Sequence, residues 1–355
     1  MSIGYELSKN DTVNVFFFTT GENTKLIEYY SGFFKENKIR IVPFKCFPFF
    51  NRSSNIWKYL PTNIYRIITL LLNFIKVKQV NALVVPLYDY IFLKRIFSDK
   101  HYIYSTHGMP SSEYALNDQI TKFDLFFLYG ERDKLERKMR NQLTAKNHEM
   151  VGFAKYDLVK NTKQQSYFKN EKTIILYNPH WNPEITSYYK IGIRIIDFFS
   201  TNDSYNLIFA PHVKLGQKKV NLKSKFKKYQ AYENIIVDLG SQACIDMSYT
   251  RCADIYLGDV SSQAFEFIFI KPRPCIFLDL RSIKAKPELR PITWEFGPVY
   301  ENIDNFDDKL SQAPVLHKTT YKEIQNRKSE AMFFKGSESP SELAAKAISN
   351  LIKNK

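Results

Sequence analysis

Residues 254–267 read Asp254-Ile-Tyr-Leu-Gly-Asp-Val-Ser-Ser-Gln-Ala-Phe-Glu-Phe267. This stretch predicts a buried strand that ends at Gly258 and Asp259, followed by a helix that begins near Ser261. In a parallel sheet such a junction faces the ligand crevice. The first amides of a helix have no acceptor within it, so together with the hydroxyls of Ser261 and Ser262 they suit a phosphate group. The alternative is that Asp259 and Ser261 only cap the helix.

Apolar runs of strand length recur on both sides of this segment and alternate with stretches of helical length. Because most of these runs are apolar throughout, they favour parallel sheets that are covered on both faces. The predicted strands are Val13–Thr19, Ile39–Phe44, Ala82–Pro86, Tyr102–Thr106, Asp124–Tyr129, Glu149–Phe153, Thr173–Tyr177, Asn206–Ala210, Asn234–Leu239, Asp254–Leu257 and Pro274–Leu278. The predicted helices are Asn63–Lys78, Glu131–Gln142, Glu184–Ser200, Asp246–Ala253, Ser261–Ile270 and Ser339–Ile352.

The pattern divides the chain into two α/β domains. A polar, lysine-rich stretch over residues 156–172 interrupts the alternation and is typical of a linker. We therefore expect an N-terminal α/β domain over 1–155 and a C-terminal α/β domain over 173–335. The closing segment, 336–355, predicts a helix capped by Ser339 that packs back on the N-terminal domain. The predicted fold class is α/β, with two doubly wound parallel-sheet domains that face a cleft.

Composition narrows the function classes. Of 355 residues, 44% are hydrophobic, which excludes a disordered chain, and the net charge of +15 favours anionic partners. The four cysteines form no CxxC pair, so reduced thiols in a cytoplasmic protein are expected. No secretory signal is visible, and the apolar stretch Ile64–Val77 is too short and too interrupted to span a bilayer. An amphipathic core helix is favoured there, with a membrane-facing helix as the alternative.

Three histidines follow predicted strands directly: His107, His180 and His212. Strand ends are where an α/β crevice collects its ligands, although a lone histidine at such a place is more often a turn residue. An imidazole there can accept a hydroxyl proton or, when protonated, bind a phosphate oxygen.

A basic run without acidic residues extends from Lys214 to Lys228. It is either a solvated face or a landing site for an anionic acceptor or the inner membrane surface. The lysines proposed for that surface are Lys218, Lys219, Lys223, Lys225, Lys227 and Lys228. No nucleic-acid motif is present, and the absence of Gly-x-Gly-x-x-Gly, P-loop, Gly-x-Ser-x-Gly and His-Glu-x-x-His patterns weakens the case for dehydrogenases, phosphate-loop ATPases, α/β-hydrolases and zincins.

The sequence resembles the CDP-glycerol glycerophosphotransferases of bacterial wall and capsule polymer synthesis, which have a GT-B fold. The strongest likeness is the segment from Ala253 to Phe267, followed by Lys271-Pro-Arg-Pro-Cys-Ile-Phe-Leu-Asp279. Ala210-Pro-His212, Tyr177-Asn-Pro-His-Trp181 and Thr106-His-Gly-Met-Pro110 are similar to further elements of that family. Glu266 departs from the family's usual Asp.

The resemblance implies that an acceptor hydroxyl attacks the β-phosphorus of a CDP-activated donor, with CMP as the leaving group. The domain over 1–155 would lie on the acceptor side, and the domain over 173–335 would bind the nucleotide donor. His107 would be the catalytic base. The donor-binding residues would be His180, His212, Asp259, Ser261, Ser262 and Glu266. No metal or other cofactor is demanded, because histidines, lysines and helix amides can offset the diphosphate charge.

Two other functions stay open from the sequence. One is a GT-B glycosyltransferase that uses a nucleotide sugar in capsule or lipopolysaccharide synthesis. The other is a non-catalytic anion-binding scaffold that docks on membranes through the lysine run. For all of these functions the expected location is the cytoplasm or the inner face of the plasma membrane. For either transferase the expected acceptor is an anionic glycan or a lipid-linked molecule.

Overall fold

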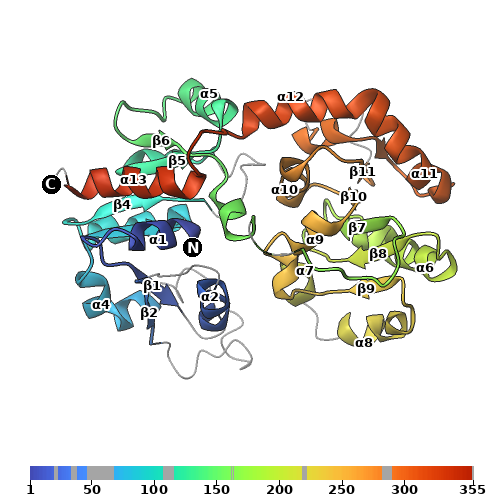
Figure 1. The fold of residues 1–355 in the computed structure, drawn as a ribbon, viewed down its shortest axis with the longest axis horizontal. Helices are drawn as coiled ribbons and strands as arrows, with labels where there is room; N and C mark the ends of the chain where they lie inside the picture. The colour runs from blue at the N-terminus through green and yellow to red at the C-terminus, as the bar shows by residue number, and fades with distance from the viewer. Residues whose placement is uncertain are drawn as a thin grey trace. The chain divides into compact units, whose positions relative to one another are not determined.

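The computed structural model describes residues 1–19, 23–32, 38–45, 68–106, 116–160, 162, 164–217, 222–281 and 290–353. The chain forms two compact units (Figure 1). Unit 1 comprises Met1–Gly108, Glu113–Thr162 and Met332–Lys355, and unit 2 comprises Met109–Ser112 and Lys163–Ala331. The strand pairs of both units are parallel, which confirms the predicted α/β class.

In unit 1, four parallel strands pair in chain order, and two further strands form a separate parallel pair. The four-stranded sheet contains β3 (Ala82–Val85), β4 (His101–Tyr104), β5 (Leu125–Leu128) and β6 (His148–Met150), and the pair contains β1 (Phe16–Thr19) and β2 (Arg40–Pro43). Its helices and helical turns are α1 (Ser2–Ser8), α2 (Asn23–Ser31), α4 (Phe74–Lys78), η3 (Tyr88–Arg95), η5 (Asp118–Lys122), α5 (Glu131–Met139), η6 (Ala154–Leu158) and α13 (Pro340–Lys353).

Alternation along the strands of unit 1 sends side chains to two covered faces. Tyr102 and Tyr104 pack on the side of η3 and η5, whereas Ile103 packs on the side of α1 and α13. Helix α13, red in Figure 1, lies beside α1 although almost the whole chain separates them. Its start is fixed by the predicted cap, since Glu342 N–H donates to Ser339 Oγ at 3.3 Å and Ser339 N–H donates to Glu342 Oε2 at 2.8 Å.

Unit 2 has one parallel sheet of six strands in the order β12-β11-β10-β7-β8-β9. The strands are β7 (Ile174–Asn178), β8 (Asn206–Phe209), β9 (Ile235–Val237), β10 (Ile255–Gly258), β11 (Cys275–Leu278) and β12 (Val299–Tyr300). The chain builds β7, β8 and β9 outward on one side and then returns to place β10 next to β7. This is the strand order of the Rossmann fold, with its topological switch point between β7 and β10.

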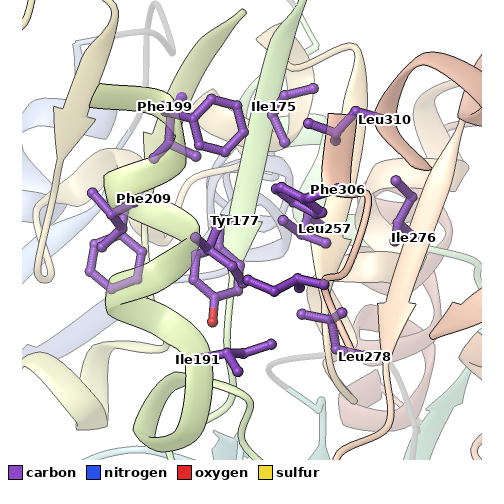
Figure 2. Close-up of a cluster of buried hydrophobic side chains, with 14 of the residues drawn as sticks. Ile175, Tyr177, Ile191, Phe199, Phe209, Leu257, Ile276, Leu278, Phe306 and Leu310 are labelled. Carbon is purple, nitrogen blue, oxygen red and sulfur yellow. The ribbon is translucent and has the colours of Figure 1, made fainter. Parts of the chain in front are cut away.

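Helices cover both faces of this sheet. They are η7 (Tyr188–Gly192), α6 (Ile193–Thr201), α7 (Val213–Gln217), α8 (Leu222–Phe226), η8 (Lys227–Ala231), η9 (Gln242–Cys244), α9 (Ser248–Cys252), α10 (Ser262–Ile270), η12 (Ile292–Phe296), α11 (Phe306–Leu316), η13 (His317–Tyr321) and α12 (Lys322–Met332). Figure 2 shows one face, where Tyr177 and Phe209 from neighbouring strands pack in the same cluster as Phe199 of α6 and Phe306 of α11. On the opposite face Tyr256 packs against Phe267 of α10, with 5.7 Å between the ring centroids.

Of the helix expected over Asn63–Lys78, residues 63–67 lie outside the described residues, and the remainder is only partly as predicted. Residues 68–72 are helical, the helix is interrupted by a turn at Asn73, and α4 follows. The side chain of Asn73 is buried and bonds to both backbone groups of Lys45. Ile75 is 73% exposed, so this part of the segment does not pack as a core helix with its apolar side chains inside. None of the described helices is long and apolar enough to cross a bilayer.

Candidate functional site

The carboxyl ends of β7 and β10 are joined by Asn178, the last residue of β7. Its side-chain carbonyl accepts hydrogen bonds from Ser261 Oγ at 3.0 Å and from the Tyr256 hydroxyl at 3.2 Å. Its amide donates to the carbonyl of Ala210 at 2.6 Å, directly after β8. Asn178 therefore fixes three strand ends and the start of α10 against one another, although we did not single it out from the sequence. The sequence feature that could have identified Asn178 is its position between a predicted strand and the turn that carries His180.

Gly258 permits this close packing at the end of β10. A Cβ atom there would lie 2.9 Å from the backbone oxygen of Asn178 and 2.9 Å from the hydroxyl of Tyr256. Both distances are shorter than van der Waals contact, so any larger residue would push the two strand ends apart. The glycine in the quoted stretch is thus required by the approach of β7 to β10.

Ser261 is the N-cap of α10. Its hydroxyl oxygen accepts the amide N–H of Gln263 at 3.2 Å while it donates to Asn178, and its backbone is extended. The capping interpretation is therefore confirmed for Ser261, and it leaves the amide of Ser262, the first helical residue, without an acceptor in its own helix. Glu266 lies further along α10 and is buried. The structure thus places Ser261 and Ser262 at the switch point.

Asp259 does not cap α10; it binds the turn after β7 instead. The side chain is fully buried, and its Oδ2 accepts the backbone N–H of His180 at 2.9 Å. Among the described residues Oδ1 has no donor of normal hydrogen-bond geometry. Burial raises the pKa of Asp259 to about 6, against the opposing effect of Ser187, His180 and Thr186, which favour the carboxylate. The buried carboxyl group of Asp259 therefore holds the turn that carries His180 in place.

His180 extends from that turn, with its ring Nδ1 accepting the backbone N–H of Asn182 at 3.1 Å. Burial, followed by the positive charges of His212, Lys214 and Arg281, lowers the pKa of His180 to about 4. The ring is consequently neutral at physiological pH. Of the two roles that the sequence left open, a protonated imidazolium at His180 is therefore disfavoured.

His212 joins His180 from the end of β8. Its backbone N–H donates to the carbonyl of Pro179 at 3.0 Å, and its Nδ1 accepts the N–H of Lys214 at 3.2 Å. The two imidazole centroids lie 5.8 Å apart, and the Trp181 ring lies 5.5 Å from His180 and 6.4 Å from His212. Lys214 Nζ lies 4.6 Å from the Trp181 centroid, which is cation–π distance. The fold thus groups two histidines, a tryptophan and a lysine at adjacent strand ends.

Other predicted site residues fall elsewhere or outside the described residues. His107, the predicted base, lies outside the described residues, as do Lys218 and Lys219 and the side chain of Lys223. Lys225 and Lys227 are exposed on α8 and η8. Lys228 is also exposed but pairs with Asp197 of α6 at 3.1 Å. One lysine of the basic run is therefore paired with an acidic residue from outside the run, on α6.

The sequence matches no protein-family model and no curated protein. The fold, however, matches solved structures over nearly its whole length. The wall teichoic acid polymerase TagF aligns with a TM-score of 0.60 at 16% identity, over 99% of this chain and 92% of that one. UDP-GlcNAc 2-epimerase from Neisseria meningitidis, solved with UDP-GlcNAc bound, aligns with a TM-score of 0.57 at 13% identity, over 100% and 96% of the two chains.

A Listeria monocytogenes protein assigned as a UDP-N-acetylglucosamine 2-epimerase also aligns, with a TM-score of 0.62 at 13% identity, over 100% of this chain and 92% of that one. At these identities the comparisons establish architecture. The resemblance to CDP-glycerol glycerophosphotransferases is accordingly confirmed for the fold: the chain has the GT-B-type fold that TagF and the epimerases share.

Proposed function

We propose that this protein is a transferase that binds a nucleotide-activated donor by its diphosphate at the carboxyl ends of β7 and β10. One observation carries the proposal. At the topological switch point, where parallel α/β sheets bind ligands, the start of α10 lies at the same edge as the turn of His180. Amides and hydroxyls at a helix start stabilise a phosphate through hydrogen bonds and the helix dipole.

The donor we favour is a CDP-activated alcohol of the CDP-glycerol type. This choice rests on the sequence likeness around Asp259 and on the shared fold with TagF, for which a variant was also solved after soaking with CDPG. In the proposed reaction an acceptor hydroxyl oxygen forms a bond to the phosphorus that carries glycerol. The bond from that phosphorus to the CMP oxygen breaks, CMP leaves, and the acceptor proton passes to His107. The acceptor would be a glycan or lipid-linked molecule of the cell envelope.

Within this scheme the protein acts mainly by placing hydrogen-bond donors where charge develops. The amides of Ser261 and Ser262 and the hydroxyl of Ser262 would hold one phosphate at the helix start, and His180 and His212 would hold its neighbour. Asp259 would keep the turn of His180 in place from below. Lys225, Lys227 and Lys228 would attract an anionic acceptor or the inner membrane surface over a longer range, which predicts a rate that falls with added salt.

A glycosyltransferase reaction with a nucleotide sugar is the second candidate, favoured by the fold shared with a UDP-GlcNAc-bound epimerase. The two can be separated by a thermal-shift screen against CDP-glycerol, CDP-ribitol, CMP-sugars, UDP-sugars and GDP-sugars, followed by product analysis with the selected donor. Selective stabilisation by a CDP-alcohol with release of CMP supports the proposal. Selective stabilisation by a nucleotide sugar with release of a nucleoside diphosphate would replace it by the second candidate.

His107→Ala separates both catalytic candidates from a non-catalytic scaffold. If His107 is the base, this variant should lose turnover and still bind the donor with wild-type affinity. A variant with Lys225, Lys227 and Lys228 changed to Gln should keep turnover of a short soluble acceptor. Normal turnover in His107→Ala would remove the base assignment. Normal function in His107→Ala together with loss of function in the lysine variant would favour the scaffold.

A further inference from the structure

The two histidines at the switch point share a feature that fixes where each ring carries its proton. Nδ1 of His180 accepts the backbone N–H of Asn182 at 3.1 Å, and Nδ1 of His212 accepts the backbone N–H of Lys214 at 3.2 Å. A backbone amide always carries its hydrogen, so each Nδ1 must present a lone pair. A neutral imidazole has one N–H, which in the neutral ring of His180 therefore lies on Nε2; the same holds for His212 whenever that ring is neutral.

Neutrality of His180 also follows from its surroundings. A proton added at Nδ1 would face the N–H of Asn182 and break that hydrogen bond. The positive charges near the ring are those of Lys214 and Arg281, with His212 as a second titratable group. Asp259 contacts the backbone N–H of His180. The ring is only partly buried, and its hydrogen bond to the described residues is made at Nδ1.

We propose that His180 binds the diphosphate of the nucleotide donor as an uncharged hydrogen-bond donor, acting through Nε2–H. This inference rests on the proposed function, which supplies the diphosphate, and it specifies which group of His180 binds it. A neutral donor cannot withdraw the acceptor proton, because the only lone pair of the ring is engaged by the backbone. The His180 ring also does not change its charge near pH 7, so its hydrogen bond to the diphosphate has the same strength across the physiological range.

The same geometry disfavours a metal ion at this pair of rings. A histidine that binds a metal through Nε2 needs its lone pair there and its proton on Nδ1, where a carbonyl or carboxylate normally accepts it. Here the neighbour of each Nδ1 is an N–H donor. His180 is therefore arranged to donate a hydrogen bond to an oxygen anion.

Binding experiments with two variants of His180 test the inference. His180→Phe keeps a flat ring without a donor, and His180→Gln keeps an amide N–H close to the position of Nε2. The probes are inorganic pyrophosphate, CDP and CDP-glycerol, measured by calorimetry on the full chain at pH 6 and pH 8. A hydrogen bond to a charged acceptor predicts a loss of about tenfold or more in affinity for His180→Phe and a loss of less than about threefold for His180→Gln.

The ratio of wild-type to His180→Phe affinity reports the charge of the ring. For a neutral donor this ratio is equal at pH 6 and pH 8, and titration of the probe cancels from it. An imidazolium with an ordinary pKa would make the ratio fall roughly 20-fold between these pH values. Nitrogen-15 NMR of the histidine rings at pH 7.5 gives an independent reading, in which His180 should show protonated Nε2 and unprotonated Nδ1. His180→Gln identifies the signal by its loss.

A ratio that falls with pH, an Nδ1–H tautomer, or wild-type affinity in His180→Phe would overturn the inference. Failure of the proposed function looks different. If His180→Phe binds pyrophosphate and CDP more weakly than wild type while neither protein binds or consumes CDP-glycerol, the role of His180 in diphosphate binding is supported and the CDP-glycerol assignment is lost. If CDP-glycerol is consumed normally by His180→Phe, the transferase stands and the role of His180 is lost.

Discussion

Replacing Asp259 by Asn should stabilise the protein in a pH-dependent way. The carboxyl group is fully buried at the end of β10, and burial raises its pKa from 3.8 to about 6. Because the folded state holds this proton more tightly than the unfolded state, stability falls as the pH rises between these two values. A shift of about 2 units corresponds to about 3 kcal/mol, which is lost in full above pH 6 to 7. Asparagine does not titrate and can still accept the N–H of His180.

The assay is urea unfolding, followed by tryptophan fluorescence, of Asp259→Asn and wild type at pH 4.5 and pH 7.5. Trp181 and Trp294 lie in unit 2, so a Trp57→Phe background makes the signal report that unit. About 2 of the 3 kcal/mol should develop between these pH values, as a gain in unfolding free energy of the variant relative to wild type. Asp304→Asn, at an exposed position, corrects for the change in net charge. A gain that is equal at both pH values would refute the account of Asp259 as a buried acid.

Two further substitutions test how the switch point is built, and a third, at Arg273, tests the packing of α9 and α10 at the other end of β10. Ser261→Ala removes both the N-cap of α10 and the hydrogen bond to Asn178, so we expect a loss of about 1–3 kcal/mol in urea unfolding, and an unchanged midpoint would contradict its role as cap. Gly258→Ala places a Cβ against Asn178 and Tyr256 and should cost about 1–3 kcal/mol; a variant as stable as wild type would show that the strand ends can separate freely. Arg273→Met leaves buried carbonyls without their guanidinium donor, and thermal unfolding should show a loss of about 3 kcal/mol or more, whereas a rise in midpoint would mean that apolar packing outweighs those bonds.

The strands of the sheets could be predicted because burial on both faces makes them apolar throughout. All eleven predicted runs overlap a strand, with ends that differ by a few residues. The twelfth, Val299–Tyr300, was missed because two half-buried residues at a sheet edge carry no recognisable pattern. Helices α11 and α12 were missed as well. Phe306–Leu316 contains Pro314, and Lys322–Met332 is rich in charge, so neither segment has an evident apolar stripe.

At the site, sequence patterns located residues but not their partners. The quoted stretch placed Ser261 at a helix start because Ser is a good cap, and the structure confirms it. Asp259 was equally good as a cap by composition, yet its oxygen bonds to His180, which is 79 residues away in the chain. Such a contact depends on the switch in strand order that brings β10 next to β7. The tautomer of His180 depends in turn on a local backbone turn that residue types alone do not specify.

The central claim is that a nucleotide diphosphate binds where α10 begins, beside the turn of His180. A crystal structure of the full chain with CDP-glycerol tests it most directly. We expect diphosphate oxygens within about 3.2 Å of the amide or hydroxyl of Ser262 and of Nε2 of His180. A diphosphate bound at any other strand edge, with Ser262 and His180 out of reach, would contradict the claim.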